Sequence, residues 1–275
     1  MILVTGATGN VGSELVTQLM ERGHSVRALT RRGGGKLPTT VETVTGDLND
    51  PAALTDAFRG VSGVFLLGGY RDMPGVLKEI SDAGVERVVL LTSRSVEGGN
   101  PSNAIVSMWL ESEAAVRASS VNWTILHPGG FMSNALRWAP QIISGGLVRV
   151  AFGDVPVAVI DPYDLAAVAC EALVTDEHSF RTYPISGPES MTPRDQVAIL
   201  SKVLGRDIAF ESQPNDEARA EMAKSMPAPM VDAFVRFFAD GEFDDTAVAP
   251  TVREVTGRDP RSFEEWARLH ASSFR

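Results

Sequence analysis

The sequence has a single cysteine among its 275 residues, and this scarcity bears on where the protein works. Cys170 cannot form an internal disulfide, and it lies in an apolar run with Leu165 and Leu173, where a buried, unreactive thiol is expected. Met1 stands directly at the start of an apolar segment, so we expect no signal peptide. We therefore expect a cytoplasmic protein, because that compartment keeps thiols reduced.

Positive charge is also scarce, since 25 Lys and Arg against 35 Asp and Glu leave a net charge of −10. An acidic surface repels nucleic acid and anionic membranes, so neither is an expected partner. No apolar stretch approaches the length of a membrane span. His24, His178 and His270 have no cysteine or histidine neighbours at ligand spacing, which argues against a metal site. The expected partner is a small-molecule substrate, bound by a monomer or a homodimer.

Glycines near the amino terminus form a pattern that is typical of phosphate binding. The apolar run 1–4 leads directly into Gly6, Gly9 and Gly12, and a helical pattern follows that closes at Gly23. Gly6 permits a tight turn, Gly9 lets the backbone approach a pyrophosphate, and Gly12 lets the helix pack on the strand. The helix amino terminus adds free N–H groups and partial positive charge. The segment predicts a dinucleotide site made by Gly6, Thr8, Gly9, Asn10, Val11 and Gly12.

The end of the second expected strand indicates which dinucleotide is bound. NAD-binding chains usually carry an acidic residue at this point, about twenty residues beyond the glycines, whereas an arginine accommodates the 2′-phosphate of NADP. This chain reads Thr30-Arg31-Arg32 with no acid in the stretch. The alternative is a pair of solvated loop arginines. Two guanidinium groups suit a dianionic phosphate, so we expect NADP(H) to be preferred over NAD(H).

Strand and helix patterns alternate through the first half, at the spacing of right-handed βαβ units. They predict an α/β fold, a doubly wound Rossmann-type parallel sheet with a smaller, mostly helical C-terminal lobe. We expect the NADP-binding core to comprise 1–131 with 153–187, and the substrate-binding lobe to comprise 132–152 with 188–275. The expected strands are 1–4, 26–29, 41–45, 64–67, 88–91, 123–126, 157–160 and 181–185, and the expected helices include 104–119, 192–205, 230–238 and 263–269.

With these elements in place, the chain resembles the NmrA-like branch of the atypical short-chain dehydrogenase/reductase superfamily. The matching segments are 6–12, Asp47-Leu48, 83–89, 123–131, 160–164 and 255–266. That branch includes quinone and triphenylmethane reductases as well as redox-sensing regulators. The stretch 68–86 is short for the family, so its helix is expected to be truncated. The resemblance implies a cofactor site that also includes Asp47 and Leu48 beside adenine, Leu67, Gly68 and Gly69 along the ribose, Thr92 and Ser93, and a nicotinamide wall of Pro128, Gly129, Gly130 and Phe131.

The superfamily's usual catalyst, a Tyr with a Lys four residues later, is missing from the sequence. Four residues beyond the three tyrosines stand Pro74, Ala167 and Gly187. On the helix where the pair belongs, Ile105 and Trp109 take the two positions, and Glu113 follows one turn later. Reducing a simple ketone requires a proton donor, whereas a conjugated or cationic acceptor delocalises the charge and needs less help.

Three residues remain as catalytic candidates, each with a structural alternative. Ser93 matches the superfamily serine that binds a substrate oxygen, or it caps the strand end. Trp109 stacks on a flat acceptor, or it is a core aromatic. His127 donates a proton, or it is a structural imidazole. We expect an NAD(P)H-dependent oxidoreductase that reduces a planar conjugated molecule, such as a quinone, enone or iminium-type compound; the alternative is a non-catalytic NADP(H)-binding redox sensor of the NmrA type.

Overall fold

A computed structural model describes residues 1–31, 33, 35 and 37–275. Its main sheet has seven parallel strands in the order β3-β2-β1-β4-β5-β6-β8. The order reverses between β1 and β4, as expected of a doubly wound Rossmann-type sheet, so the predicted fold class is confirmed. The strands are β1 (Ile2–Thr5), β2 (Val26–Thr30), β3 (Glu42–Thr45), β4 (Gly63–Leu67), β5 (Arg87–Leu91), β6 (Asn122–Pro128) and β8 (Arg181–Ile185).

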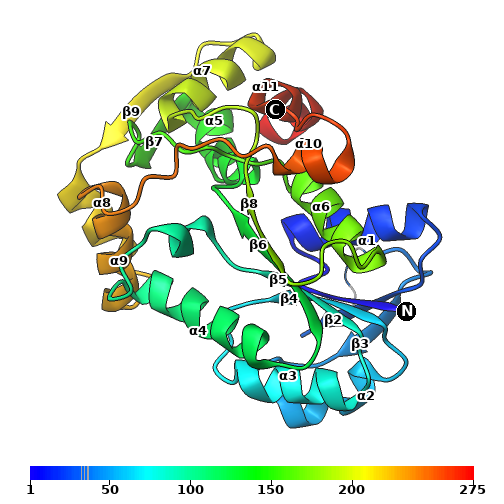
Figure 1. Cartoon of the computed structure of the whole chain (residues 1–275). Helices are drawn as coiled ribbons and strands as arrows, with labels where there is room; N and C mark the ends of the chain where they lie inside the picture. Colours follow the sequence, from blue (N-terminus) through cyan, green and yellow to red (C-terminus); the bar gives the residue numbers. More distant parts are fainter. Residues whose placement is uncertain (32, 34, 36) are drawn as a thin grey trace.

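Helices cover both faces of this sheet (Figure 1). On one face α1 (Asn10–Glu21) packs on α6 (Pro162–Val174), with α10 (Thr251–Thr256) beyond it. On the other face lie η1 (Pro51–Leu54), α2 (Thr55–Phe58), α3 (Met73–Asp82) and α4 (Ala104–Ala118). The predicted helix 104–119 is therefore confirmed, and the short connection 68–86 holds a helix of ten residues. Each face buries its own apolar cluster, as parallel sheets require.

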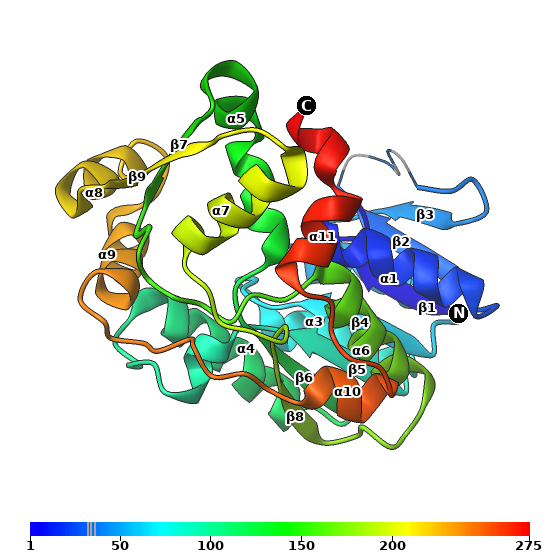
Figure 2. The same cartoon turned by 90° about the horizontal axis from the view of Figure 1, so that it is seen from above.

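The remaining elements form a lobe over the carboxyl ends of the strands (Figure 2). It contains the expected helices α7 (Pro193–Leu204), α9 (Ala228–Phe238) and α11 (Phe263–Leu269). Thr192 and Asp195 form a capping box at the start of α7, and Gly205 ends it with a φ of 65°. The sequence did not predict a second, two-stranded parallel sheet of β7 (Leu147–Ala151) and β9 (Ala209–Gln213). The other elements are η2 (Arg94–Glu97), η3 (Met132–Trp138), α5 (Ala139–Gly145), α8 (Asn215–Met222) and η4 (Ala271–Phe274).

The prediction of a strand over 157–160 was wrong. The segment is extended but makes only isolated bridges, from Val157 to Met191 and from Ile160 to Phe131. Its other backbone groups pair with separate loops, because the Ala158 N–H donates to the carbonyl of Asp245 at 2.7 Å and the Val159 carbonyl accepts from Gly187. An apolar, β-branched run reads as a strand in sequence, but these partners do not lie along one neighbouring strand.

Candidate functional site

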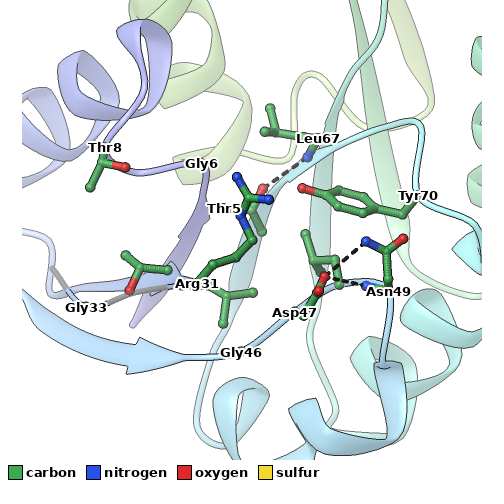
Figure 3. Close-up of a pocket in the computed structure, with 13 residues that line it drawn as sticks. Thr5, Gly6, Thr8, Arg31, Gly33, Gly46, Asp47, Asn49, Leu67 and Tyr70 are labelled. Atoms are coloured by element: carbon green, nitrogen blue, oxygen red, sulfur yellow. Dashed lines mark hydrogen bonds between the residues drawn. The ribbon is translucent and has the colours of Figure 1, made fainter. Parts of the chain in front are cut away.

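A cavity of about 720 Å³ lies at the carboxyl ends of β1, β2 and β4, where the strand order reverses. This is the place at which doubly wound sheets bind ligands. Figure 3 shows residues from the β1 turn, the β2 end, the β3 end and the β4 end facing one another across it. The lining residues are Thr5, Gly6, Thr8, Leu29, Thr30, Arg31, Gly33, Gly46, Asp47, Leu48, Asn49, Leu67 and Tyr70.

The glycine turn between β1 and α1 is packed too closely for side chains at two of its three glycines. Gly6 has a φ of 61°, and a Cβ on it would lie 2.7 Å from Leu67 Cδ1. A Cβ on Gly12 would lie 2.2 Å from the carbonyl oxygen of Gly6, a backbone atom that cannot rotate away. A Cβ on Gly9 would meet that oxygen at 3.2 Å, and its φ of −86° suits any residue. Gly6 and Gly12 thus hold the turn together, whereas Gly9 leaves its outer side open for a ligand.

Polar groups on the β2 and β3 sides of the cavity suit the adenosine half of a dinucleotide. The Arg31 side chain extends into the cavity toward Tyr70 (Figure 3). Asp47 accepts hydrogen bonds from the Asn49 backbone at 2.9 Å and from its amide at 3.1 Å, and these bonds lower the pKa of Asp47. Burial raises the pKa of Tyr70, so its hydroxyl stays protonated. The other predicted phosphate ligand, Arg32, lies outside the described residues.

One buried hydroxyl stands out among the groups that line this cavity. The hydroxyl of Thr30, at the end of β2, has no hydrogen-bond partner within the described part of the chain. Buried polar groups are rarely left unpaired, so an orphaned hydroxyl in a cavity wall is suited to a bound polar molecule. Together with the open backbone at Gly9 and the exposed Arg31, it shows that the residues present fit a dinucleotide.

The predicted residues at the ends of β5 and β6 form a buried ionic network. The side chain of His127 is 4% exposed, and its ring bonds Glu97 through Nδ1 at 2.8 Å and Glu113 through Nε2 at 2.6 Å. Burial opposes the charge, but the two carboxylates outweigh it and raise the pKa of His127. Thr92 donates to Glu113 at 2.9 Å. Both ring nitrogens of His127 are therefore engaged by carboxylates, which is the arrangement of a structural imidazolium.

Ser93 and Trp109 occupy positions that match their structural alternatives. Ser93 caps η2, since its Oγ accepts a hydrogen bond from the Ser95 backbone at 3.2 Å. A Cβ on Gly68 would lie 3.2 Å from the Trp109 ring, so this indole covers the loop after β4. Its other side packs on the cluster of Ile105, Val106, Ala233 and Phe237, between α4 and α9. The cavity at the ends of β1, β2 and β4, as lined by the described residues, does not include Trp109, Ser93, Gly68 or Gly69.

The segment 128–131 leads from the sheet into a second cavity of about 400 Å³. Gly130 and Phe131 line its sheet side, and the lobe supplies aromatic and methionine side chains on the other. Phe152 stacks on Phe238 with ring centroids 5.4 Å apart, which joins the end of β7 to α9. The lining residues are Gly130, Phe131, Asn134, Arg137, Trp138, Val150, Ala151, Phe152, Val155, Val157, Val159, Met191, Pro193, Gln196, Met222, Met226, Phe234, Phe238 and Asp245. The cavity is therefore mainly apolar, with few polar groups.

Several lining residues were not predicted from the sequence. Thr30, Asn49 and Tyr70 in the first cavity directly follow or neighbour predicted strands, so their place at strand ends was a usable signal. Asp245 in the second cavity lies in a segment without periodicity, and nothing local marks it. Asn10, by contrast, was predicted at the pyrophosphate, and its amide donates to Ser133 at 3.0 Å, linking the glycine turn to η3.

Two relatives that align with this chain over its whole length are named as reductases. The chain is 44% identical to (4-alkanoyl-5-oxo-2,5-dihydrofuran-3-yl)methyl phosphate reductase from Streptomyces griseus, over 100% of this chain and 99% of that protein. It is 33% identical to NAD(P)H azoreductase from Xenophilus azovorans, again over 100% and 99%. The expectation of an NAD(P)H-dependent reductase is confirmed at this level.

Solved structures share the fold. The NADPH-dependent quinone oxidoreductase of Escherichia coli superposes with a TM-score of 0.79 at 23% identity, over 98% of this chain and 99% of that one. The triphenylmethane reductase of Citrobacter sp., in complex with NADP(H), gives 0.80 at 22% identity, over 98% and 100%. No helix among the described residues is long and apolar enough to cross a membrane. The model of the NAD(P)H-binding family matches residues 6–176, and the chain therefore belongs to the NAD(P)H-binding family.

Proposed function

We propose that this protein is an NADPH-dependent reductase of a planar, conjugated small molecule, and that hydride transfer proceeds without a Tyr/Lys pair. The observation that carries the proposal is the placement of two unlike cavities along one edge of the sheet. The first is polar and fits a dinucleotide, and the second is apolar and starts at the expected nicotinamide wall, Gly130 and Phe131. A hydride donor and an apolar acceptor can meet at such a junction.

The second cavity suits an acceptor with an apolar part and an anionic group. Met222, Met226 and Phe234 offer an adaptable apolar surface, and the exposed Arg137 supplies positive charge. The relative at 44% identity is named for a dihydrofuranone that carries an alkanoyl chain and a phosphate. A conjugated lactone of that kind is the acceptor we favour, because its ring is flat and its carbonyl delocalises the charge left by hydride addition. The interleaved lobe 132–152 and 188–275 is then the substrate-binding lobe.

The preference for NADPH rests on the β2 end. Arg31 extends into the cavity. Thr30, the residue before it, also lines the cavity, and its hydroxyl has no hydrogen-bond partner among the described residues. When bound, NADPH supplies the hydride. The glycine turn orients the cofactor, and Arg31 engages its 2′-phosphate. We also propose that the chain belongs to the NmrA-like branch of the atypical short-chain reductases and that it works in the cytoplasm.

The test is a turnover assay that follows NADPH oxidation with an acyl-butenolide, a quinone, an azo dye, a cationic triarylmethyl dye and cyclohexanone. We expect turnover of the conjugated or cationic acceptors and none of the simple ketone. Tight NADPH binding without oxidation by any conjugated or cationic acceptor would contradict the proposal and favour the non-catalytic sensor. The same assay with NADH measures the cofactor preference.

A further inference from the structure

An extended segment between α9 and α10, residues 241–250, crosses from the lobe to the sheet (Figure 2). It is fixed at three points. The Asp245 carbonyl accepts from the Ala158 backbone at 2.7 Å, the Ala247 carbonyl accepts from Arg94, and the Ala249 N–H donates to Ser186 Oγ at 2.8 Å. These bonds hold Asp245 in one place, so its carboxyl is a fixed feature of the second cavity.

The Asp245 carboxyl faces the predicted nicotinamide wall. A Cβ built on Gly129 would lie 3.4 Å from each of its oxygens, and Gly130 lines the same cavity. The side chain is 13% exposed, and Oδ1 is buried without a hydrogen-bond partner among the described residues. Arg94 Nη1 lies 3.5 Å from Oδ1 but directs its hydrogen bond to Ala247. Asp245 thus has a buried oxygen that forms an ion pair with Arg94 but accepts no hydrogen bond among the described residues, and a catalytic role is one explanation for such a group.

We propose that Asp245 is the proton donor to the acceptor, an inference that rests on the proposed function. The acceptor receives a hydride, and therefore two electrons, at its β-carbon, and the C=C pair shifts to give an enolate. The O–H bond of Asp245 then breaks, and its proton forms an O–H or C–H bond on the enolate. Asp245 is left as a carboxylate and regains a proton from water. The sum consumes one NADPH and one proton and yields NADP⁺ and the saturated carbonyl compound.

The electrostatic surroundings favour a protonated carboxyl. Burial raises the pKa of Asp245 to about 7, and the charge of Arg94 and the Gly130 backbone only partly offset it. The carboxylates of Asp244 and Glu97 act in the same direction as burial. A group whose pKa lies near the working pH can both give and regain a proton, which is the requirement for a general acid.

The test compares Asp245→Asn with the parent on two acceptors that differ in their need for a proton. A conjugated enone needs one, whereas hydride addition to a cationic triarylmethyl dye gives a neutral product directly. We expect Asp245→Asn to lose enone turnover by roughly 100-fold or more, the range of a missing general acid, and to keep dye turnover within about twofold. Asp240→Asn, which changes an exposed acid just before the segment 241–250, is the matched control and should leave both rates unchanged.

The pH dependence of turnover and that of stability provide two further tests. In the parent, enone turnover should decline above the pH at which Asp245 loses its proton, while dye turnover should show no such decline. In the cofactor-free parent, the urea concentration at the midpoint of unfolding should fall as the pH rises from mildly acidic to neutral. In Asp245→Asn this fall should be absent, apart from the pH dependence that both proteins share.

Each other result counts against the inference. Unchanged enone turnover in Asp245→Asn, with active parent protein, would overturn the role of Asp245 and leave the proposed function standing. Equal loss on both acceptors would show that Asp245 supports the cavity structurally, and would also overturn it. A parent inert toward both acceptors would overturn the proposed function, and this inference with it.

Discussion

Replacing Asp245 by asparagine should change how the stability of the protein depends on pH. Folding raises the pKa of this carboxyl from 3.8 to about 7 through burial. Below about pH 3 the folded and unfolded chains both carry the proton, and the group has no effect on the free energy of unfolding. Between the two pKa values only the folded chain holds it, so the free energy of unfolding falls as the pH rises. Above about pH 7 both states are ionised and the loss levels off.

The magnitude follows from the size of the shift. One pKa unit corresponds to about 1.4 kcal/mol, so a shift of about three units costs about 4 kcal/mol once the loss is complete. Roughly two thirds of it, about 3 kcal/mol, falls between about pH 4.5 and about pH 7. Asparagine has a similar shape and no charge, so Asp245→Asn should gain about 3 kcal/mol relative to the parent across that window.

Urea denaturation followed by tryptophan fluorescence measures this difference at each pH. Asp240→Asn serves as the control, because it removes an exposed acid close to the same segment. If the parent instead gained stability relative to Asp245→Asn as the pH rose, Asp245 would be an ionised partner of Arg94. That outcome, or a difference independent of pH, would refute the reasoning.

Three other predictions address the cofactor and the acceptor. Arg31→Ala should weaken NADPH binding by about 1–3 kcal/mol, as one lost charge-assisted contact does, and leave NADH binding nearly unchanged; calorimetric titration with both cofactors checks this. Gly9→Val should abolish binding of either dinucleotide while the protein stays folded. Gly12→Ala should instead destabilise the fold by about 1–3 kcal/mol or more, because its Cβ meets the Gly6 carbonyl. Circular dichroism during denaturation distinguishes the folded Gly9 variant from the destabilised Gly12 variant. Trp109→Ala, which removes a partly buried ring covering Gly68, should lower stability by about 1–3 kcal/mol; a rise in KM alone would instead support stacking on the acceptor.

The sheet, α1 and α7 could be predicted because local chemistry determines them. The glycine turn has to follow a strand and precede a helix, and Thr192 and Gly205 mark the two ends of α7 by their own backbone preferences. The cofactor cavity was predictable in outline for the same reason, since the carboxyl ends of β1, β2 and β4 necessarily converge at one edge of the sheet.

The second cavity could not be predicted in the same way because its walls come from distant parts of the chain. Val157 looks like part of a strand, yet its bridge is to Met191, and no local pattern specifies that pairing. Strands β7 and β9 pair in parallel across more than fifty residues, which sequence periodicity does not reveal. Asp245 is buried only because Arg94, Ala158 and the lobe close around it, so its unusual state depends on tertiary structure alone.

The helix that lacks the Tyr/Lys pair shows why a proton donor would come from elsewhere. Ile105 and Trp109 have become part of the packing between α4 and α9, and Glu113 is bound to His127. A residue placed on this helix would have to disturb that packing or that ion pair to reach a substrate. The segment 241–250 approaches the expected nicotinamide wall from the lobe side, beside Gly129, and its Asp245 lines the second cavity. A carboxyl carried by that segment can therefore face the acceptor without disturbing the packing of α4.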